Sequence, residues 1–134
     1  QKLKTAAKGL DVEFVINPDF NELKKLYAQA KFFWHAAGLG VNEQTDPEKV
    51  EHFGMVTVEA MASGCVPIVI NKGGQKEIIT TGSGYLCEDS SEIITKTNEL
   101  IQDPSVLTEM AKKAFDRSRF FSIGNFFEKI KLLL

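Results

Sequence analysis

Residues 65–70 read CVPIVI, and this nearly continuous β-branched run constrains the fold more than any other part of the chain. A strand whose consecutive side chains are all apolar is typical of a parallel sheet that is covered on both faces. Segments with helical periodicity separate it from three further apolar runs, VEFVI (12–16), KFFWHAA (31–37) and YLC (85–87). Strands that alternate with helices predict an α/β fold, a Rossmann-like parallel sheet with helices on both faces.

Capping patterns mark where the helices begin. Asp19, Asp89 and Ser122 each precede apolar residues at helical spacing, and Asp103-Pro104 places proline at a favoured first position. A central helix is expected from about residue 53 or 54 to a stop at residue 64, and a short one at 75–80. We interpret the apolar stripes of these helices as core packing.

Composition indicates one globular domain, residues 1–134, with its own core. The net charge of −2 and the lack of a basic stripe argue against nucleic-acid binding. Apolar runs are too short to span a membrane, and Cys65 and Cys87 lie in strand-like segments that suit buried reduced thiols, so we expect a cytoplasmic protein. Because the chain opens with Gln1 and its first strand signal follows ten residues later, we expect a piece of a longer protein.

Several familiar motifs are incomplete. The segment GLGVNE (38–43) begins like a dinucleotide fingerprint, but Glu43 stands where the third glycine belongs. The histidines and cysteines lack metal-ligand spacing, no Asp-x-Asp pair occurs, and no Gly-x-Ser-x-Gly elbow is present. We therefore expect no metal and no cofactor. The polar loop at 38–50 is expected to be mobile.

Residues 51–64, EHFGMVTVEAMASG, raise the question of what binds Glu59, the only charged residue from 53 to 64. A carboxylate in apolar surroundings loses solvation unless another group pairs with it, so Glu59 needs a structural partner or a ligand. Gly54 stands at the expected helix start, where free N–H groups and the helix dipole favour an anion.

If that helix extended back to Glu51, the two carboxylates would lie within about 80° of each other around its axis. They could then flank an anion that carries hydroxyl groups on either side, as a nucleotide sugar does. The spacing alone leaves a structural alternative open, in which Glu51 is solvated near the helix dipole and Glu59 forms a buried ion pair.

Residues 51–79, EHFGMVTVEAMASGCVPIVINKGGQKEII, resemble the donor-binding half of glycosyltransferase family 4, which contains retaining enzymes with the GT-B fold. The resemblance rests on two glutamates with seven residues between them, the Phe-Gly after the first, the Glu-Ala-Met-Ala-x-Gly helix, the Pro-Ile-Val strand and the Gly-Gly pair. Weaker similarity covers NPDFNELKKLYAQAKFFW upstream and RFFSIGNFFEKI near the end. His52 departs from the family pattern, which usually has proline or a small residue there.

The resemblance implies a role for each site residue. Glu51 would be the catalytic-centre residue that binds hydroxyls of the donor sugar, and Glu59 would bind the ribose. The remaining positions would contact the donor mostly through the backbone: Phe53, Gly54, Met55, Val56, Gly73 and Gly74. Asn17 would lie near the base, and Glu77 would cap a helix or be structural.

By the same resemblance, the chain is the carboxyl-terminal half of a two-domain GT-B enzyme whose first strands, cationic diphosphate clamp and acceptor domain lie before position 1. It would help to transfer a hexose from a UDP- or GDP-sugar to a glycan or lipid-linked acceptor, without a metal, and would be inactive as an isolated domain. Membrane contact would come through the absent domain, at a cytoplasmic face. The alternatives are a GT-B-fold sugar-nucleotide epimerase and a non-catalytic nucleotide-binding module.

Overall fold

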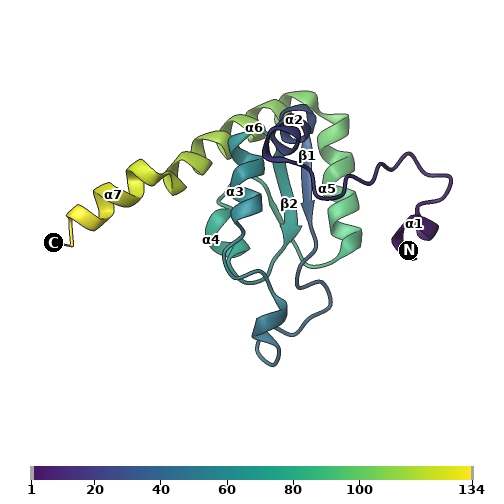
Figure 1. The fold of residues 1–134 in the computed structure, drawn as a ribbon, viewed down its shortest axis with the longest axis horizontal. Coiled ribbons are helices and arrows are strands. Elements are labelled where there is room, and N and C mark those ends of the chain that lie inside the picture. Colours follow the sequence, from purple (N-terminus) through teal and green to yellow (C-terminus); the bar gives the residue numbers. More distant parts are fainter. Residues whose placement is uncertain (1, 134) are drawn as a thin grey trace.

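A three-stranded parallel sheet in the order β1-β2-β3 organises the computed structural model, which describes residues 2–133 (Figure 1). In chain order the elements are α1 (Lys2–Ala6), α2 (Phe20–Gln29), β1 (Phe32–His35), η1 (Pro47–Lys49), α3 (Met55–Ala62), β2 (Val66–Ile70), α4 (Gln75–Ile78), β3 (Tyr85–Cys87), α5 (Ser90–Gln102), α6 (Pro104–Ser118), η2 (Arg119–Phe121) and α7 (Ile123–Lys131). The register pairs Phe32 with Val66 and Ile68 with Tyr85.

Strand β2 is buried along its whole length, as the apolar run predicted. Val66, Ile68 and Ile70 face a core that includes Leu100 of α5 and Met110 of α6. The alternate side of the sheet packs under α3 and α4, in a second core formed by Met61, Val69, Ile78, Ile79 and Ala114. In Figure 1, α3 and α4 lie on one side of the sheet and α5 on the other. The prediction of helices on both faces is confirmed.

The predicted helix starts are also confirmed, because each capping side chain accepts the expected backbone N–H. Asp19 binds the N–H of Glu22 at 2.8 Å, and Asp89 binds that of Glu92 at 2.9 Å. Asp103 accepts from the two N–H groups at positions 105 and 106, both at 3.1 Å. These caps satisfy N–H groups that a helix start leaves without a helical partner.

The prediction of a strand at 12–16 is wrong. The segment is extended, but no strand among residues 2–133 pairs with it, and its apolar side chains are exposed, with Val12 at 52% and Ile16 at 67%. A β-branched run becomes a strand only where a neighbouring strand accepts and donates its hydrogen bonds. Asn17 then adopts a left-handed conformation, with φ at 52°, immediately before α2.

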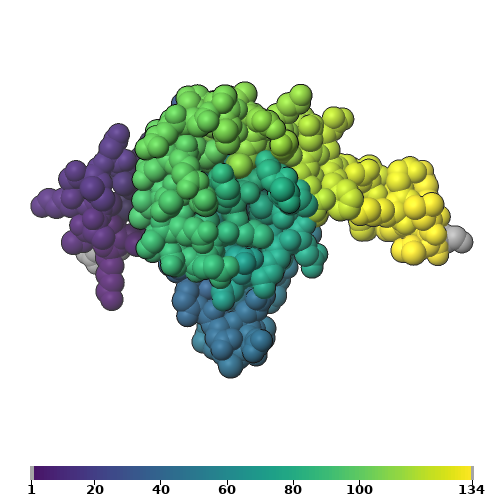
Figure 2. Space-filling model, turned by 180° about the vertical axis from the view of Figure 1, so that it is seen from behind, coloured from purple at the N-terminus to yellow at the C-terminus, as the bar shows by residue number. Residues whose placement is uncertain are grey.

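Three segments project from the body formed by the sheet and the helices on its two faces. Helix α1 and the following extended segment leave it on one side, and α7 leaves it on the opposite side (Figure 1). The loop at 38–50 protrudes beyond the carboxyl ends of β1 and β2, and it is seen again as a separate lobe from behind (Figure 2). The carboxyl edge of the sheet is therefore the place where loops, and not helices, form the surface.

Candidate functional site

Helix α3 begins at Met55, one residue beyond the predicted start, with Gly54 as its N-cap. Gly54 has φ at 90°, a left-handed conformation that favours glycine and prevents the helix from extending back to Glu51. The predicted 80° arrangement of the two glutamates around one helix axis is therefore wrong. Instead, Glu51 Oε1 accepts the N–H groups of Phe53 at 3.3 Å and Gly54 at 3.0 Å.

The next two backbone N–H groups have no hydrogen-bond acceptor within the described part of the chain. Met55 and Val56 open the first turn of α3, and their backbone N–H groups make no hydrogen bond to any of residues 2–133. Helix starts leave such donors pointing outward, where they and the helix dipole attract an anion. Both side chains are exposed, so a ligand can reach this turn.

The Gly73-Gly74 pair packs directly on the backbone that carries Glu51. The Gly74 N–H donates to the Glu51 carbonyl at 2.8 Å. A Cβ atom at Gly73 would lie 2.1 Å from that same carbonyl oxygen, and one at Gly74 would lie 2.3 Å from the His52 carbonyl oxygen. Only glycine allows this approach, so the pair fixes where the Glu51 segment lies.

Glu43 connects the long loop to the same glycine pair. Its Oε1 accepts the Gly73 N–H at 2.8 Å, and its Oε2 forms an ion pair with Lys76 Nζ at 2.6 Å. These two interactions, the Lys76 hydrogen bond first, hold the pKa of Glu43 below its ordinary value. Glu43, which does not fit a dinucleotide motif, is thus an anchor for the loop.

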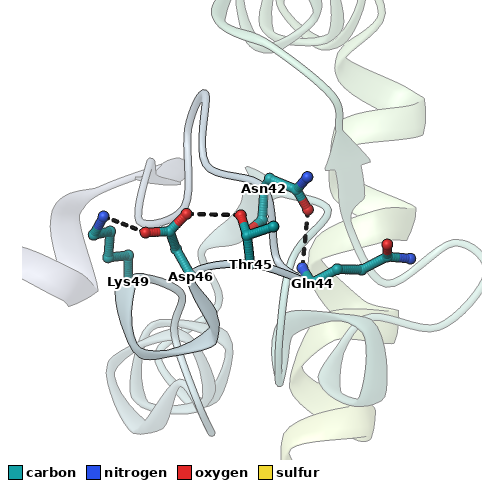
Figure 3. Close-up of polar contacts among 5 residues, drawn as sticks. All are labelled: Asn42, Gln44, Thr45, Asp46 and Lys49. Carbon is teal, nitrogen blue, oxygen red and sulfur yellow. Dashed lines mark hydrogen bonds and ion pairs between the residues drawn. The ribbon is translucent and has the colours of Figure 1, made fainter.

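Within residues 2–133, the polar contacts of the outer part of the loop are all short-range (Figure 3). Asn42 accepts the Gln44 N–H at 2.9 Å, and the Thr45 hydroxyl donates to Asp46 at 2.8 Å. Asp46 also pairs with Lys49, and this bond lowers the pKa of the Asp46 carboxyl more than the Thr45 bond does. These partners are close in sequence, and all but the half-buried Asp46 are exposed.

Glu59 is exposed, so the expectation that apolar groups surround it is wrong. Helix α3 buries Thr57, Ala60 and Met61 and turns Glu59 outward. No hydrogen bond or ion pair joins the Glu59 carboxylate to another of residues 2–133; only the backbone carbonyl of Glu59 accepts, from Ser63. The structural alternative for Glu59, a buried ion pair, is thereby overturned.

A mostly apolar cavity of about 280 Å³ lies between α2 and α3 beside Glu59. Its lining consists of Phe20, Leu23, Lys24, Tyr27, Glu59, Ala62 and Ser63. Burial, then the negative charge of Glu59, raises the pKa of Tyr27, so its hydroxyl stays protonated at neutral pH and can donate. A cavity with an apolar wall and few polar groups is what a small organic ligand requires.

His35 and Gln75 are functional candidates that the sequence reasoning missed. His35 is the last residue of β1, and its Nε2 lies 3.7 Å from Glu51 Oε2. On its other side, His35 Nδ1 lies 3.4 Å from the side-chain nitrogen of Gln75, the buried first residue of α4. The lack of metal-ligand spacing argues against a role for His35 as a ligand, whereas its position close to the carboxyl end of the apolar run at 31–37 is the signal that could have found it.

The structure brings most of the predicted residues to one edge of the sheet. Contacts join Glu51, Phe53, Gly54, Gly73 and Gly74, while Met55, Val56 and Glu59 lie on the exposed side of α3. The Phe53 ring packs edge-to-face on Phe121 of η2. Asn17 and Glu77, whose expected roles were weaker, lie outside this group of contacts. The side chain of Asn17 is exposed and makes no hydrogen bond within residues 2–133, and Glu77 lies inside α4 and caps no helix.

Residues 1–117 match the family model described as Glycosyl transferases group 1. The chain belongs to this family. The group 1 glycosyltransferases that resemble it include the GDP-Man:Man(3)GlcNAc(2)-PP-Dol alpha-1,2-mannosyltransferase of Dictyostelium discoideum, which is 30% identical over 132 residues, 94% of this chain and 24% of the relative. Another is the human alpha-1,3/1,6-mannosyltransferase ALG2, which is 30% identical over 122 residues, 78% of this chain and 29% of the relative.

A solved structure of the same family confirms the fold class. The C-terminal domain of the glycosyl transferase group 1 protein LpcC from Francisella tularensis superposes with a TM-score of 0.70 at 28% identity, covering 91% of this chain and 62% of that one. The chain is therefore a Rossmann-like fragment that matches the C-terminal domain of a GT-B glycosyltransferase. It spans about a quarter of the length of the curated relatives named above.

No helix between residues 2 and 133 has both the length and the apolar character of a membrane span. Within the same residues, no group of three or more His, Cys, Asp and Glu side chains is arranged so that it could hold a metal ion.

Proposed function

We propose that residues 1–134 form the nucleotide-sugar-binding domain of a larger, two-domain retaining glycosyltransferase. The observation that carries the proposal is the start of α3, where the N–H groups of Met55 and Val56 are unoccupied and carboxylates stand on both sides along the chain. A diphosphate would bind these N–H groups and the helix dipole. Glu51 would accept hydroxyls of the sugar, and Glu59, beside the cavity, would accept those of the ribose.

The other predicted residues support this site mainly by shape. Gly73 and Gly74 hold the Glu51 backbone in place, and Phe53 and Gly54 direct their N–H groups to the Glu51 carboxylate. No residue of the chain need act as general base, because in front-face transfer the leaving phosphate takes the acceptor proton. The proposed reaction uses no metal and no cofactor.

The donor we propose is a hexose linked to UDP or GDP, and GDP-mannose is the first to test. Both relatives named above are mannosyltransferases by name, and the name of the Dictyostelium protein includes GDP-Man. We propose a glycan or lipid-linked acceptor, bound by the amino-terminal domain on the cytoplasmic side of a membrane. The epimerase and the non-catalytic module are not favoured, because both relatives named above carry transferase names.

Nucleotide titration of a Glu59→Ala variant tests the proposal. Loss of a charged hydrogen-bond acceptor costs about 1.5–3 kcal/mol, so GDP or UDP affinity should fall about tenfold to a hundredfold by calorimetry. Glu77→Ala is the matched control, since Glu77 is an exposed carboxylate on α4 that lies outside the proposed site, and affinity should not change. If both substitutions lowered nucleotide affinity equally, or if neither lowered it, the assignment of Glu59 to the ribose would be contradicted.

A further inference from the structure

We propose that His35 is a positioning residue for Glu51, and that Gln75 holds the His35 ring so that Nε2 carries the proton facing Glu51. The imidazole lies between the two side chains, with Nδ1 3.4 Å from Gln75 Nε2 and Nε2 3.7 Å from Glu51 Oε2. Its side chain is only 17% exposed, and its ring stacks on Phe33 at a centroid distance of 6.0 Å. The ring is therefore held from three sides.

Both polar neighbours select the same tautomer. An amide nitrogen only donates, so the Gln75 side chain requires His35 Nδ1 to accept, and the single proton of a neutral imidazole must then be on Nε2. The Glu51 carboxylate only accepts, so it too requires a proton on Nε2. A ring with the opposite tautomer would direct a lone pair at the carboxylate.

Burial of the polar Gln75 side chain costs free energy, which indicates that its amide has a structural or functional role. The residue is fully buried, and its side-chain oxygen has no hydrogen-bond partner among residues 2–133. A methionine of similar length would avoid burying an unpaired oxygen. The amide is wedged against Gly54, where an added Cβ would lie 3.0 Å from Gln75 Nε2. The contact with His35 is the one polar contact of the Gln75 side chain within the described residues.

The consequence is that both oxygens of Glu51 face N–H groups before any ligand binds. Oε1 accepts the N–H groups of Phe53 and Gly54, and Oε2 lies 3.7 Å from His35 Nε2, an electrostatic contact longer than a hydrogen bond. A carboxylate oriented by hydrogen bonds at one oxygen and by electrostatic attraction at the other presents its remaining lone pairs in one direction. If Glu51 binds the donor sugar, a point that rests on the proposed function, this fixed direction aligns the sugar for transfer.

Two amide substitutions at His35 distinguish the contributions of its two ring nitrogens. Both variants are compared in kinetic assays of the full-length enzyme. The nitrogen of Gln can replace Nε2, whereas the nitrogen of Asn can replace only Nδ1. We expect His35→Asn to lower kcat about tenfold or more while nucleotide affinity stays within about twofold of that of the unchanged enzyme. We expect His35→Gln to retain most of the kcat of the unchanged enzyme. Equal activity of both variants and the unchanged enzyme, or an equal loss in both, would overturn the proposal.

Imidazole nitrogen NMR of the same protein tests the arrangement without activity. The His35→Asn variant identifies which imidazole signals in the full-length spectrum belong to His35. We expect His35 to show a protonated Nε2 and an accepting Nδ1, and Gln75→Met to remove this preference. An Nδ1-protonated ring, or a spectrum insensitive to Gln75→Met, would overturn the proposal. If the NMR result holds while Glu51→Ala leaves turnover unchanged, it is the proposed function that fails, and His35 merely orients a structural carboxylate.

Discussion

Glu51 and Glu59 are both glutamates of one short segment, but they have different neighbours. The Glu51 carboxylate accepts two backbone N–H groups and faces His35, whereas the exposed Glu59 carboxylate makes no hydrogen bond or ion pair with the rest of residues 2–133. A side chain fixed before binding suits a role in the transition state, and a side chain at a cavity mouth suits ground-state binding. Substitutions of the two residues should therefore have different effects on turnover and on nucleotide affinity.

We expect Glu51→Ala in the full-length enzyme to lower kcat strongly and to leave the affinity for GDP or UDP nearly unchanged. Positive charge develops on the sugar ring as the glycosidic bond breaks, so an interaction with Glu51 strengthens toward the transition state. Steady-state kinetics with parallel nucleotide titration measures both quantities. Glu48→Ala, on the exposed η1, is the control that should change neither. A loss of nucleotide affinity with unchanged kcat would mean that the two glutamates have exchanged roles.

Gly74→Ala should destabilise the fold by about 1–3 kcal/mol, the usual cost of forcing an atom into a packed site. Its new Cβ would lie 2.3 Å from the His52 carbonyl oxygen. Gly124→Ala is the opposite case, because that position lies in α7 and its nearest neighbour would be Ser122 Oγ at 3.9 Å. Alanine favours a helix over glycine by up to about 1 kcal/mol, so this control should be neutral or stabilising. Urea denaturation checks both variants, and equal midpoints would refute the close packing at Gly74.

At the scale of elements, the loop at 38–50 has a fixed point and a freer tip. Glu43 bonds to the Gly73 N–H and to Lys76, whereas Asn42, Thr45 and Asp46 bond only within the loop. The expected mobility of the loop stays a prediction, and it applies first to the tip. The position of Glu43 also links loop motion to the glycine pair under Glu51.

The Glu43 anchor should depend on pH. Its pKa is lowered in the folded protein, so the anchor is complete above the ordinary glutamate pKa and is lost as the pH falls through the lowered value. The Gly73 amide proton, followed by NMR, should shift over that acidic range. Glu43→Gln should remove the shift and increase protease cleavage of the loop tip at neutral pH, and Glu48→Gln should do neither. If the Gly73 amide resonance did not shift on acidification, the hydrogen bond from Gly73 to Glu43 would be absent in solution.

The sequence predicted local features well and contacts between distant positions poorly. Capping residues such as Asp19 and Asp89 act on N–H groups three residues away, so the pattern contains all the information needed. The run at 12–16 has the composition of a strand, but strand formation depends on a partner that composition does not specify. The contacts of His35 with Gln75 and Glu51 depend on where parallel strands end in space. Low amphipathicity along α3 likewise hid the outward direction of Glu59.

The whole molecule is a small sheet with two cores, one under α5 and α6 and one under α3 and α4. Both cysteines are buried in this body, Cys65 just before β2 and Cys87 at the end of β3. Burial raises the pKa of both thiols, and that of Cys87 rises to about 11, with nearby carboxylates, led by Glu92, adding to the effect of burial. The thiolate is the reactive form, so both residues should be inert in the native state.

Thiol labelling should therefore report global unfolding. We expect an aromatic disulfide reagent at neutral pH to react slowly with the native protein and rapidly in denaturant, at a rate that follows the unfolding equilibrium. A Cys65→Ser variant isolates Cys87 and should behave in the same way. Rapid, complete labelling of the native chain would contradict the burial of both thiols.

The single tryptophan gives the molecule a built-in optical signal. Trp34 lies on β1, its indole N–H donates to the Thr97 hydroxyl of α5 at 3.0 Å, and 58% of its surface is exposed. Its emission therefore comes from a partly wet ring next to the sheet edge. A segment that bound to this edge would exclude water from the ring and shift its fluorescence to shorter wavelength. The rate at which such a segment binds could then be followed without an added dye.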